Sequence, residues 1–354
     1  MKRTLWVGSY TEPGSGTGVG ISAVVLDDAG LPVRVRQVSS GVRNPSFLAV
    51  AAPTPGDSAS PDSASPDDVI YAVEEQQAGT VVSLNRADLS LRSRTSSGGS
   101  DPCDLTVRGG HLLVANYSSG MVAVIPVRDG ALSPLTSLAE NTGSGPDSDR
   151  QRSPHAHQVT LTQRETVLVC DLGTDRVDEY SLAPTGTLTL LCSAQLPAGA
   201  GPRHLVHRVS EAGEDLLVAG ELDARLHRFR RSADGWIWAS DVALAARGTE
   251  TQAAPSALHL SDDGGNLYVA VRGPDVIVVL EVPAISTDAD PRVLARVPSG
   301  GQWPRHIVLD GPRLYVANER SHRISVLSIG TDGIPNPEPV RQFAVNSPTC
   351  LVLT

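Results

Sequence analysis

Short apolar segments recur along the whole chain, separated by turns that are rich in glycine, proline and aspartate. The most regular of them are near-continuous apolar runs at residues 70–73, 112–115, 167–170, 216–219, 267–270 and 314–317. Runs of this kind are typical of β-strands that are buried on both faces. No segment shows a sustained helical period, so the sequence predicts an all-β fold.

A proline stands at the start of a strand-length segment seven times, at Pro45, Pro102, Pro154, Pro202, Pro255, Pro304 and Pro348. The successive intervals are 57, 52, 48, 53, 49 and 44 residues. A period of about 50 residues with room for four strands is typical of the blades of a β-propeller. The first interval is the longest because residues 53–68, rich in Pro, Ser, Asp and Ala, form an insertion that we expect to be a disordered loop.

The unit that follows Pro202 shows the internal plan of a blade most clearly. Its four expected strands are residues 203–206, 215–220, 224–230 and 235–244. The third of these strands alternates between polar and apolar residues, and this alternation predicts a strand that is exposed on one face.

The two ends of the chain are expected to complete one blade together. Residues 348–353 predict a first strand with no strands after it. Residues 5–8, 18–26 and 33–39 predict a second, third and fourth strand with no first strand before them. Pairing the ends closes the ring and removes the exposed sheet edges. We therefore expect residues 1–354 to form a single domain, a seven-bladed β-propeller closed by its N- and C-terminal strands.

Composition narrows the classes of function. The chain has 29 Lys and Arg against 39 Asp and Glu, a net charge of −10, which argues against nucleic acid or a membrane surface as a partner. Its four cysteines include no Cys-x-x-Cys pair, which is typical of a reducing compartment. The sequence shows no signal-peptide pattern and no apolar run of the roughly 20 residues that a membrane helix needs, so we expect a cytoplasmic protein.

Two sets of polar residues are expected to meet at one end of the central channel. In a four-stranded blade the innermost strand lines the channel, and its start lies on the same face as the turn between the second and third strands. The starts of the innermost strands supply Asp104, His155, His157, Arg203, His204, Arg305 and His306. The ends of the second strands supply Glu74, Asn116, Tyr117, Asp171, Glu221, Arg272, Asn318 and Glu319.

Three arginines at the channel mouth of an acidic protein predict an anionic ligand, because a guanidinium group pairs with carboxylate or phosphate through two parallel hydrogen bonds. His155 and Glu221 are groups that can move protons near neutral pH. Together these residues favour hydrolysis or isomerisation of a small anionic compound. A single arginine or histidine in such a place is often structural. The recurrence of ionisable groups at one position in three repeats favours a site.

Other kinds of site find little support in the sequence. His155 and His157 alternate along a strand and point to opposite faces, so we expect no metal site. The glycine-rich residues 14–20 precede a strand rather than a helix, which is not the arrangement of a phosphate-binding loop. The chain has no Gly-x-Ser-x-Gly sequence, which argues against a serine hydrolase. We expect no cofactor.

Eight short motifs follow one another along the chain, at residues 7–11, 44–48, 114–117, 154–158, 171–175, 201–204, 303–306 and 316–320. In this order and spacing they resemble the propeller-fold lactonase family, which includes bacterial 6-phosphogluconolactonases and fungal carboxy-muconate cyclases. The resemblance extends over essentially the whole chain. It implies a propeller fold and chemistry on a lactone.

The resemblance also implies which residues form the site. Its centre would be His155, Arg203, Glu221 and Arg272. Arg272 matches with one departure, because Val271 stands where the family usually has asparagine. The further residues that we expect to bind the substrate are Arg305, His306, His204, His157, Asn116, Tyr117, Asp171 and Glu319.

The sequence leaves the reaction open between three interpretations. The first is a lactonase that hydrolyses a small anionic sugar lactone, above all 6-phosphogluconolactone, with Glu221 or His155 deprotonating the water. The second is a cycloisomerase of the carboxy-muconate type, which would use the same arginines to bind carboxylates. The third is a non-catalytic propeller that binds a partner. It predicts apolar side chains on the rim, where this chain has charges and histidines.

Overall fold

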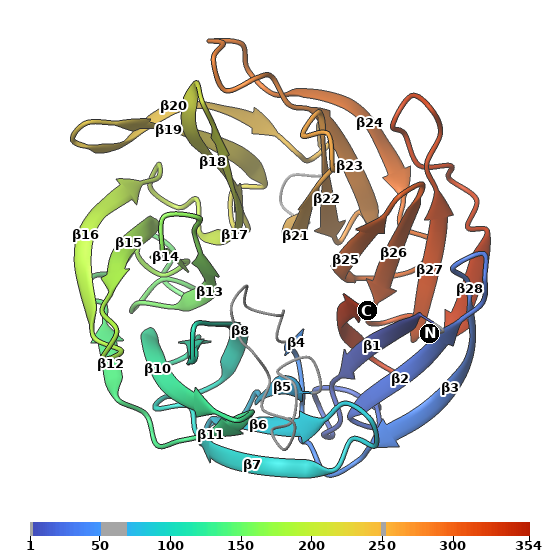
Figure 1. Cartoon of the computed structure of the whole chain (residues 1–354). Coiled ribbons are helices and arrows are strands. Elements are labelled where there is room, and N and C mark those ends of the chain that lie inside the picture. Colours follow the sequence, from blue (N-terminus) through green and yellow to red (C-terminus); the bar gives the residue numbers. More distant parts are fainter. Residues whose placement is uncertain (1–2, 51–68, 249–252) are drawn as a thin grey trace.

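The computed structural model describes residues 3–50, 69–248 and 253–354. Within these ranges every regular element is a β-strand, and the strands form seven sheets arranged as blades around a central axis (Figure 1). The predicted seven-bladed β-propeller is confirmed. The insertion predicted at residues 53–68 lies outside the described residues. In the part of the chain that the structure describes, no helix has the length and apolar character needed to cross a bilayer.

We number the blades by the order of their innermost strands. Blade 1 contains β4 (Leu48–Val50), β5 (Val69–Glu74), β6 (Thr80–Asn85) and β7 (Leu91–Ser96). Blade 2 contains β8 (Pro102–Arg108), β9 (His111–Asn116), β10 (Met121–Arg128), the short β11 (Ala131–Leu132) and β12 (Ser137–Glu140). Blade 3 contains β13 (Ala156–Leu161), β14 (Thr166–Asp171), β15 (Arg176–Leu182) and β16 (Leu188–Gln195).

The remaining four blades repeat the same antiparallel plan. Blade 4 contains β17 (Pro202–Ser210), β18 (Gly213–Gly220), β19 (Arg225–Ser232) and β20 (Gly235–Ala243). Blade 5 contains β21 (Ala254–Leu260), β22 (Asn266–Arg272), β23 (Val276–Glu281) and β24 (Arg292–Pro298). Blade 6 contains β25 (Pro304–Asp310), β26 (Arg313–Asn318), β27 (Arg323–Ser328) and β28 (Arg341–Ala344). Blade 7 contains β29 (Pro348–Leu353), β1 (Thr4–Ser9), β2 (Ile21–Leu26) and β3 (Pro32–Ser39).

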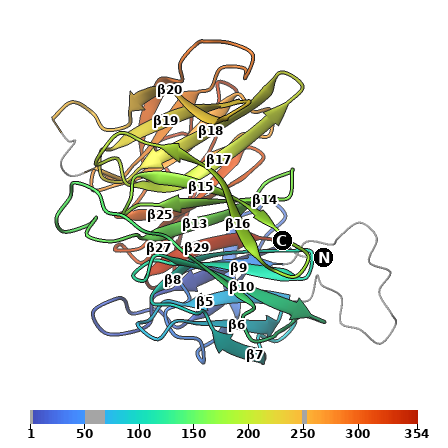
Figure 2. The same ribbon diagram turned by 90° about the vertical axis from the view of Figure 1, so that its left-hand side faces the viewer.

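The ring closes by pairing the two ends of the chain. β29 is the innermost strand of blade 7 and pairs antiparallel with β1, so that Leu5 lies opposite Leu353. The indole Nε1 of Trp6 donates a hydrogen bond to Thr354 Oγ1 at 3.1 Å. The two ends of the chain therefore lie side by side (Figure 2). The closure predicted from the sequence is confirmed.

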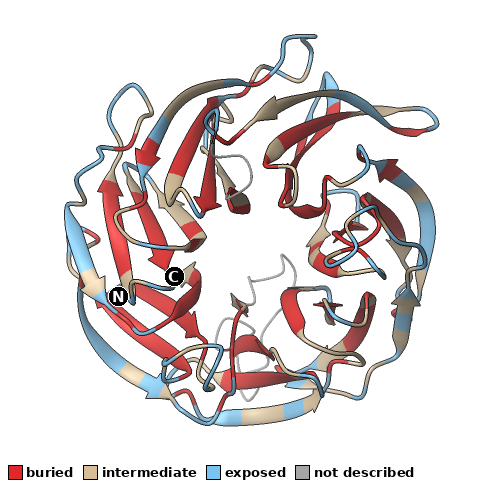
Figure 3. Ribbon diagram, turned by 180° about the vertical axis from the view of Figure 1, so that it is seen from behind, coloured by how far each residue is buried: buried red, intermediate tan, exposed pale blue. Residues whose placement is uncertain are grey.

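The hydrophobic core lies between neighbouring blades. The second and third strands are buried along most of their length, whereas the outermost strands are largely exposed (Figure 3). One cluster packs Leu5 and Val24 of blade 7 against Tyr315 and Val326 of blade 6. Because the inner strands are covered on both faces by adjacent blades, near-continuous apolar runs recur in every second strand.

The third strand of blade 4 is buried from Leu226 to Phe229, although its alternating sequence predicted a half-exposed strand. In β19 the side chains of His227 and Arg228 are both buried. Arg228 donates through Nε to Asp215 Oδ2 at 2.9 Å and through Nη1 to the carbonyl oxygen of Ala289 at 2.6 Å. Arg208 also donates to Asp215, at 2.8 Å from its Nε. One buried carboxylate thus compensates two buried cations, so polar residues do not mark an exposed face here.

Removing this buried carboxylate should destabilise the protein strongly. Asp215→Ala leaves the guanidinium groups of Arg208 and Arg228 buried without their anion, which we expect to cost about 3–5 kcal/mol in the free energy of unfolding. Asp288→Ala is the control, because Asp288 pairs with Arg230 while 98% exposed and should cost less than about 0.5 kcal/mol. Urea denaturation measures both variants. Equal effects would contradict the special role of the buried cluster.

Candidate active site

The innermost strands carry a β-bulge close to their start. In five blades the pairing with the second strand skips one residue there, and this releases the skipped residue from the ladder. The skipped residues are Cys103, His157, Arg203, Arg305 and Thr349. Cys103, Arg203, Arg305 and Thr349 line one cavity together with Ser46 of blade 1. Because residues from five blades can meet only near the axis, this cavity belongs to the central channel.

The position of the bulge in blade 3 shows that one alignment between the sequence repeats was wrong. In blades 2, 4 and 6 the skipped residue directly follows the proline, as Arg203 does. In blade 3 the skipped residue is His157, and Ala156 takes the proline's place in the pairing with β14. His155 is therefore the counterpart of Gly201, the residue before the proline. The sequence pattern aligned Arg203 with His155, whereas the structure aligns Arg203 with His157, two residues later.

In five blades, the residue that follows the second strand contributes to a second ring of side chains. Its backbone N–H donates to the carbonyl oxygen of the residue before the proline. The pairs are Tyr10 with Ser347 (3.1 Å), Glu75 with Asn44 (3.2 Å), Tyr117 with Asp101 (3.0 Å), Glu221 with Gly201 (2.8 Å) and Glu319 with Trp303 (3.1 Å). All five acceptor residues have φ between 44° and 62°, a left-handed conformation that is uncommon for residues other than glycine. This shared turn brings five side chains to the same level of the channel mouth.

Two of the predicted residues, Asn116 at the end of β9 and Asp171 at the end of β14, bind within the blades instead. Asn116 donates through Nδ2 to the carbonyl oxygen of Ser97 at 2.9 Å. Asp171 Oδ1 accepts from the backbone N–H groups of His155 and Gly173, at 2.8 and 3.0 Å. The structure therefore does not bring the predicted Asn116 and Asp171 side chains into the channel mouth. Their contacts stabilise the turns that carry the site.

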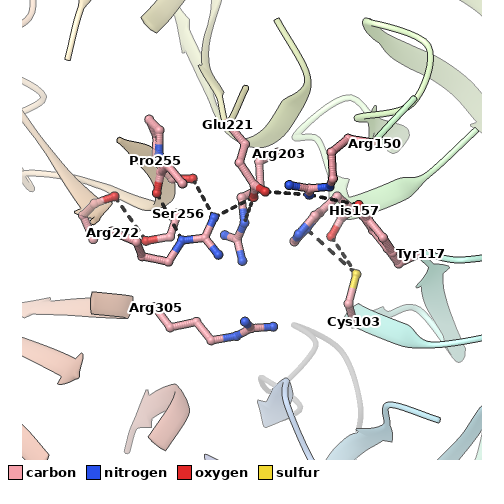
Figure 4. A network of polar contacts seen from close by, with 12 residues as sticks. Cys103, Tyr117, Arg150, His157, Arg203, Glu221, Pro255, Ser256, Arg272 and Arg305 are labelled. Atoms are coloured by element: carbon pink, nitrogen blue, oxygen red, sulfur yellow. Dashed lines mark hydrogen bonds and ion pairs between the residues drawn. The ribbon is translucent and has the colours of Figure 1, made fainter. Parts of the chain in front are cut away.

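Glu221 is the centre of the charge network at the mouth (Figure 4). Its Oε2 accepts a hydrogen bond from Arg272 Nη2 at 2.7 Å and lies 2.9 Å from Arg203 Nε, and its Oε1 accepts from Arg150 Nη2 at 2.7 Å. Burial raises the pKa of this carboxyl group, but the guanidinium groups of Arg272 and Arg203 outweigh it and hold the pKa well below its usual value. Glu221 is therefore ionised near neutral pH and anchors the arginines.

Arg203 lines the cavity with a guanidinium group that has one N–H donor without a partner among the described residues. Its side chain is 4% exposed, and its Nη1 has no hydrogen-bond partner among the described residues. Burial, followed by repulsion from Arg272, lowers the pKa of Arg203, whereas Glu221 opposes this shift. Buried N–H groups without a partner are rare, because each costs roughly 1–3 kcal/mol. The site therefore keeps a donor that one anionic or carbonyl oxygen, of about the size of the water molecule that the cavity admits, can satisfy.

Arg305 forms a second charge cluster at the mouth. Its Nη2 donates to the Tyr10 hydroxyl, and its Nη1 donates to Glu319 Oε2 at 3.4 Å. The same Nη2 lies 3.8 Å from Glu75 Oε2. The Tyr10 hydroxyl lies 2.9 Å from both carboxyl oxygens of Glu75. Although burial opposes the shift, Tyr10 and Glu319 raise the pKa of Arg305, so this side chain remains a cation.

His155 lies beside Tyr117. The imidazole stacks on the tyrosine ring with 4.6 Å between centroids, and its Nδ1 lies 2.9 Å from the backbone carbonyl oxygen of Tyr117. A carbonyl oxygen only accepts hydrogen bonds, so Nδ1 carries a proton. When the ring carries a single proton, Nε2 therefore holds the free lone pair. Arg150 donates to the Tyr117 hydroxyl at 3.1 Å and so connects this pair to Glu221.

Three further histidines pack closely around the cavity. The rings of His157 and His204 lie 5.5 Å apart, and Phe47 lies 6.4 Å from His204 and 5.7 Å from His306. The cavity lined by Phe47, His204 and His306 has a volume of about 10 Å³, room for about one water molecule. Burial lowers the pKa of His157 and His204 well below the usual value and that of His306 to about 3. All three imidazoles are therefore neutral.

Most of the predicted site residues thus meet at the mouth or the cavity: His155, His157, Tyr117, Arg203, His204, Glu221, Arg272, Arg305, His306 and Glu319. Among the described residues, no group of three or more His, Cys, Asp and Glu is arranged to hold a metal ion.

The mouth also holds three residues that were not predicted from the sequence, Tyr10, Glu75 and Arg150. Tyr10 and Glu75 follow a second strand in the same way as Glu221, so an alignment on the residue after the strand finds them. The prediction chose Glu74 instead, whose carboxylate is fully buried and paired with Arg94 at 2.8 Å. Arg150 lies between β12 and β13, in a connection to which the repeat assigns no position.

The three neutral histidines predict a loss of stability in acid. A folded-state pKa below the unfolded value of about 6.5 means that unfolding binds protons below that pH. The buried carboxyl groups of Asp104 and Glu75 have raised pKa values and titrate in the opposite sense, so they reduce this loss. We expect the free energy of unfolding to be highest above about pH 6.5 and to fall by about 1.4 kcal/mol per pH unit for each net proton bound.

Thermal melts between about pH 7.5 and 5.5 measure this slope, and His306→Asn isolates one contribution to it. The Nδ1 of His306 accepts from the backbone N–H of Leu351 at 3.4 Å, and asparagine retains an acceptor that does not titrate. The melting temperature of His306→Asn should therefore fall less steeply with acid than that of the wild type. Identical slopes would exclude His306 as a source of the pH dependence.

Several known proteins are similar to this chain over most of their length. A 6-phosphogluconolactonase of Bacillus subtilis is 29% identical over 314 residues, which cover 86% of this chain and 84% of the relative. A 6-phosphogluconolactonase of Formosa agariphila is 24% identical over 342 residues, which cover 91% of each chain. The solved structure of a periplasmic gluconolactonase of Pseudomonas aeruginosa has a TM-score of 0.86 and 27% identity, and covers 100% of this chain and 99% of its own.

The profile of one protein family, described as "Lactonase, 7-bladed beta-propeller", matches residues 4–353. The match spans all seven blades, including the strands of both ends that close the ring. The resemblance that the sequence motifs carried is confirmed over the same extent. The chain therefore belongs to the lactonase family of seven-bladed β-propellers.

Proposed function

We propose that this protein hydrolyses a small anionic sugar lactone, with 6-phosphogluconolactone as the substrate to test first. Membership of the lactonase family supports the reaction, and relatives named 6-phosphogluconolactonase support the substrate. The observation that carries the proposal is the buried Arg203 guanidinium, which Glu221 holds in place while Nη1 stays without a partner among the described residues.

Arg203 is suited to stabilise the charge that develops during lactone hydrolysis. When water adds to the carbonyl carbon, the carbonyl oxygen becomes an oxyanion. A buried donor that is already in position stabilises this oxyanion without reorganisation. The bond between the carbonyl carbon and the ring oxygen then breaks and leaves a carboxylic acid and an alcohol. The acid ionises, and the arginines of the mouth bind its carboxylate.

His155 is the group that takes the proton from the attacking water. The carbonyl oxygen of Tyr117 fixes the proton on Nδ1, so that Nε2 is free to accept. Glu221 was the other candidate from the sequence. Because Arg272 and Arg203 hold the pKa of Glu221 low, its carboxylate binds protons too weakly for this task.

Arg150 and Arg305 are the cations that would bind a phosphate group on the lactone. The side chain of Arg150 is 42% exposed at the mouth, and that of Arg305 is 16% exposed. Guanidinium groups pair well with phosphate oxygens. One similar structure is named a gluconolactonase, so the phosphate is a part of the proposal that must be tested separately.

The role of Arg203 can be tested by removing its side chain. Purified protein is mixed with freshly generated 6-phosphogluconolactone, and acid release is followed beside the spontaneous reaction. We expect the wild type to accelerate ring opening and Arg203→Ala to lower kcat by about 10²–10³-fold, as the loss of an oxyanion donor does. Arg292→Ala removes an exposed arginine of β24 and should match the wild type. An inactive wild type would refute the substrate, and a fully active Arg203→Ala would refute the role of Arg203.

The phosphate is tested by comparing 6-phosphogluconolactone with unphosphorylated gluconolactone. Arg150→Ala removes a charged hydrogen-bond donor. If this donor binds the phosphate, we expect its loss to raise the KM for the phosphorylated lactone about 10-fold. The KM for gluconolactone should stay within about twofold of the wild-type value. An equal rise for both substrates would show that Arg150 does not bind the phosphate.

A further inference from the structure

Glu75 and Glu221 hold the same position in two different blades. Glu75 follows β5 and Glu221 follows β18, and each donates its backbone N–H to the residue before the proline, at 3.2 and 2.8 Å. Figure 1 shows these two strands on opposite sides of the ring. The two carboxyl groups therefore reach the same channel mouth from opposite walls.

The surroundings of the two carboxyl groups differ in charge. Glu221 is in contact with three guanidinium groups. Glu75 instead accepts a hydrogen bond from the Tyr10 hydroxyl. Among the described residues its ion pair is with Arg305, at 3.8 Å, and Arg305 also pairs with Glu319. Burial raises the pKa of Glu75, although Arg305 and Tyr10 oppose the shift. The carboxyl group of Glu221 thus stays ionised, whereas burial shifts that of Glu75 toward its protonated form, and acid and base pairs typically differ in this way.

The proposed hydrolysis leaves one role unfilled. The ring oxygen departs with a full negative charge unless it receives a proton, and positioned acids accelerate such steps by about 10²–10⁴-fold. His155 accepts the proton from the attacking water and therefore does not serve as the acid in the same step. The arginines donate hydrogen bonds but do not release protons in this range of pH. A protonated carboxyl group at the mouth is suited to the task.

We propose that Glu75 is the general acid that protonates the ring oxygen as the lactone opens, with Tyr10 positioning its carboxyl group. The bond between the carbonyl carbon and the ring oxygen breaks, its electron pair stays on the oxygen, and the proton moves from Glu75 to that oxygen. His155 has taken one proton from water, and it returns a proton through solvent to Glu75. The cycle consumes one water molecule and releases one proton when the product acid ionises. This inference rests on the proposed lactonase function.

The pH dependence of the reaction follows from the state of Glu75. The acid must be protonated, so kcat falls as the pH rises through the pKa of Glu75. The other titratable or charged groups that surround it from the adjoining blades are Tyr10, Asp101, Cys103, Arg305 and Glu319. Tyr10 donates to the carboxylate and so favours its ionised form. Removing the hydroxyl group therefore raises the pKa of Glu75.

Three variants of the full-length protein test the inference by the rate of lactone opening from about pH 5.5 to about 8, after subtraction of the spontaneous rate. Glu75→Gln should lower kcat by about 10²–10⁴-fold, leave KM within about threefold and abolish the fall in rate at high pH. Glu75→Asp keeps a carboxyl group and should retain that fall. Glu12→Gln is the matched control, because Glu12 is a nearby carboxylate that accepts from Gln76, and it should behave as the wild type.

The outcomes separate the two proposals. A wild type that opens no lactone refutes the proposed function itself. An active wild type with an unimpaired Glu75→Gln, or an impaired Glu75→Gln that keeps the wild-type pH profile, refutes Glu75 as the acid. If Glu75→Gln does not fold, Tyr10→Phe decides. The fall in its rate should move to higher pH, and an unchanged position would overturn the inference.

Discussion

Three guanidinium groups converge on the carboxylate of Glu221, and the chemistry of the channel mouth depends on this interaction. A single buried carboxylate makes it possible to hold Arg203 and Arg272 close together despite their repulsion. It cannot neutralise both of them and Arg150 as well. The mouth of an acidic protein thus keeps an excess of positive charge. The proposed binding of an anion rests on that imbalance rather than on any one arginine.

The architecture could be predicted because every blade meets the same physical demand. Each second strand is covered on both faces, so its apolar run recurs, and Leu5 and Leu353 at the chain ends supply the missing blade. The third strand of blade 4 was predicted wrongly because Arg228 is neutralised inside the fold by Asp215. Burial of a compensated charge leaves no signature in an alternating pattern.

The site was predicted by residue type better than by position. The arginines and Glu221 could be recognised because ionisable groups interrupt an apolar repeat. The place of His157 could not, because in blade 3 the proline lies two residues before Ala156, the residue that pairs with the end of the second strand. Glu75 was missed by one residue, because in blade 1 the turn after β5, and not the end of that strand, delivers a side chain to the mouth. Arg150 comes from a connection outside the repeat.

The channel mouth is asymmetric in charge although the backbone around it repeats. The same turn presents Glu221 to a cluster of arginines and Glu75 to a tyrosine hydroxyl and one shared arginine. The difference gives two identical side chains different affinities for protons. The propeller allows this difference, because in both blades the turn is held by the backbone N–H of the residue after the second strand, whatever side chain that residue carries.

A crystal structure of the protein with bound 6-phosphogluconate tests the central claim most directly. The account predicts a carboxylate oxygen of this product within about 2.7–3.1 Å of Arg203 Nη1, with Glu221 still paired to Arg203 and Arg272. The phosphate should lie against Arg150 or Arg305. A ligand bound elsewhere on the propeller, or one that leaves Arg203 Nη1 without a partner, would contradict the account.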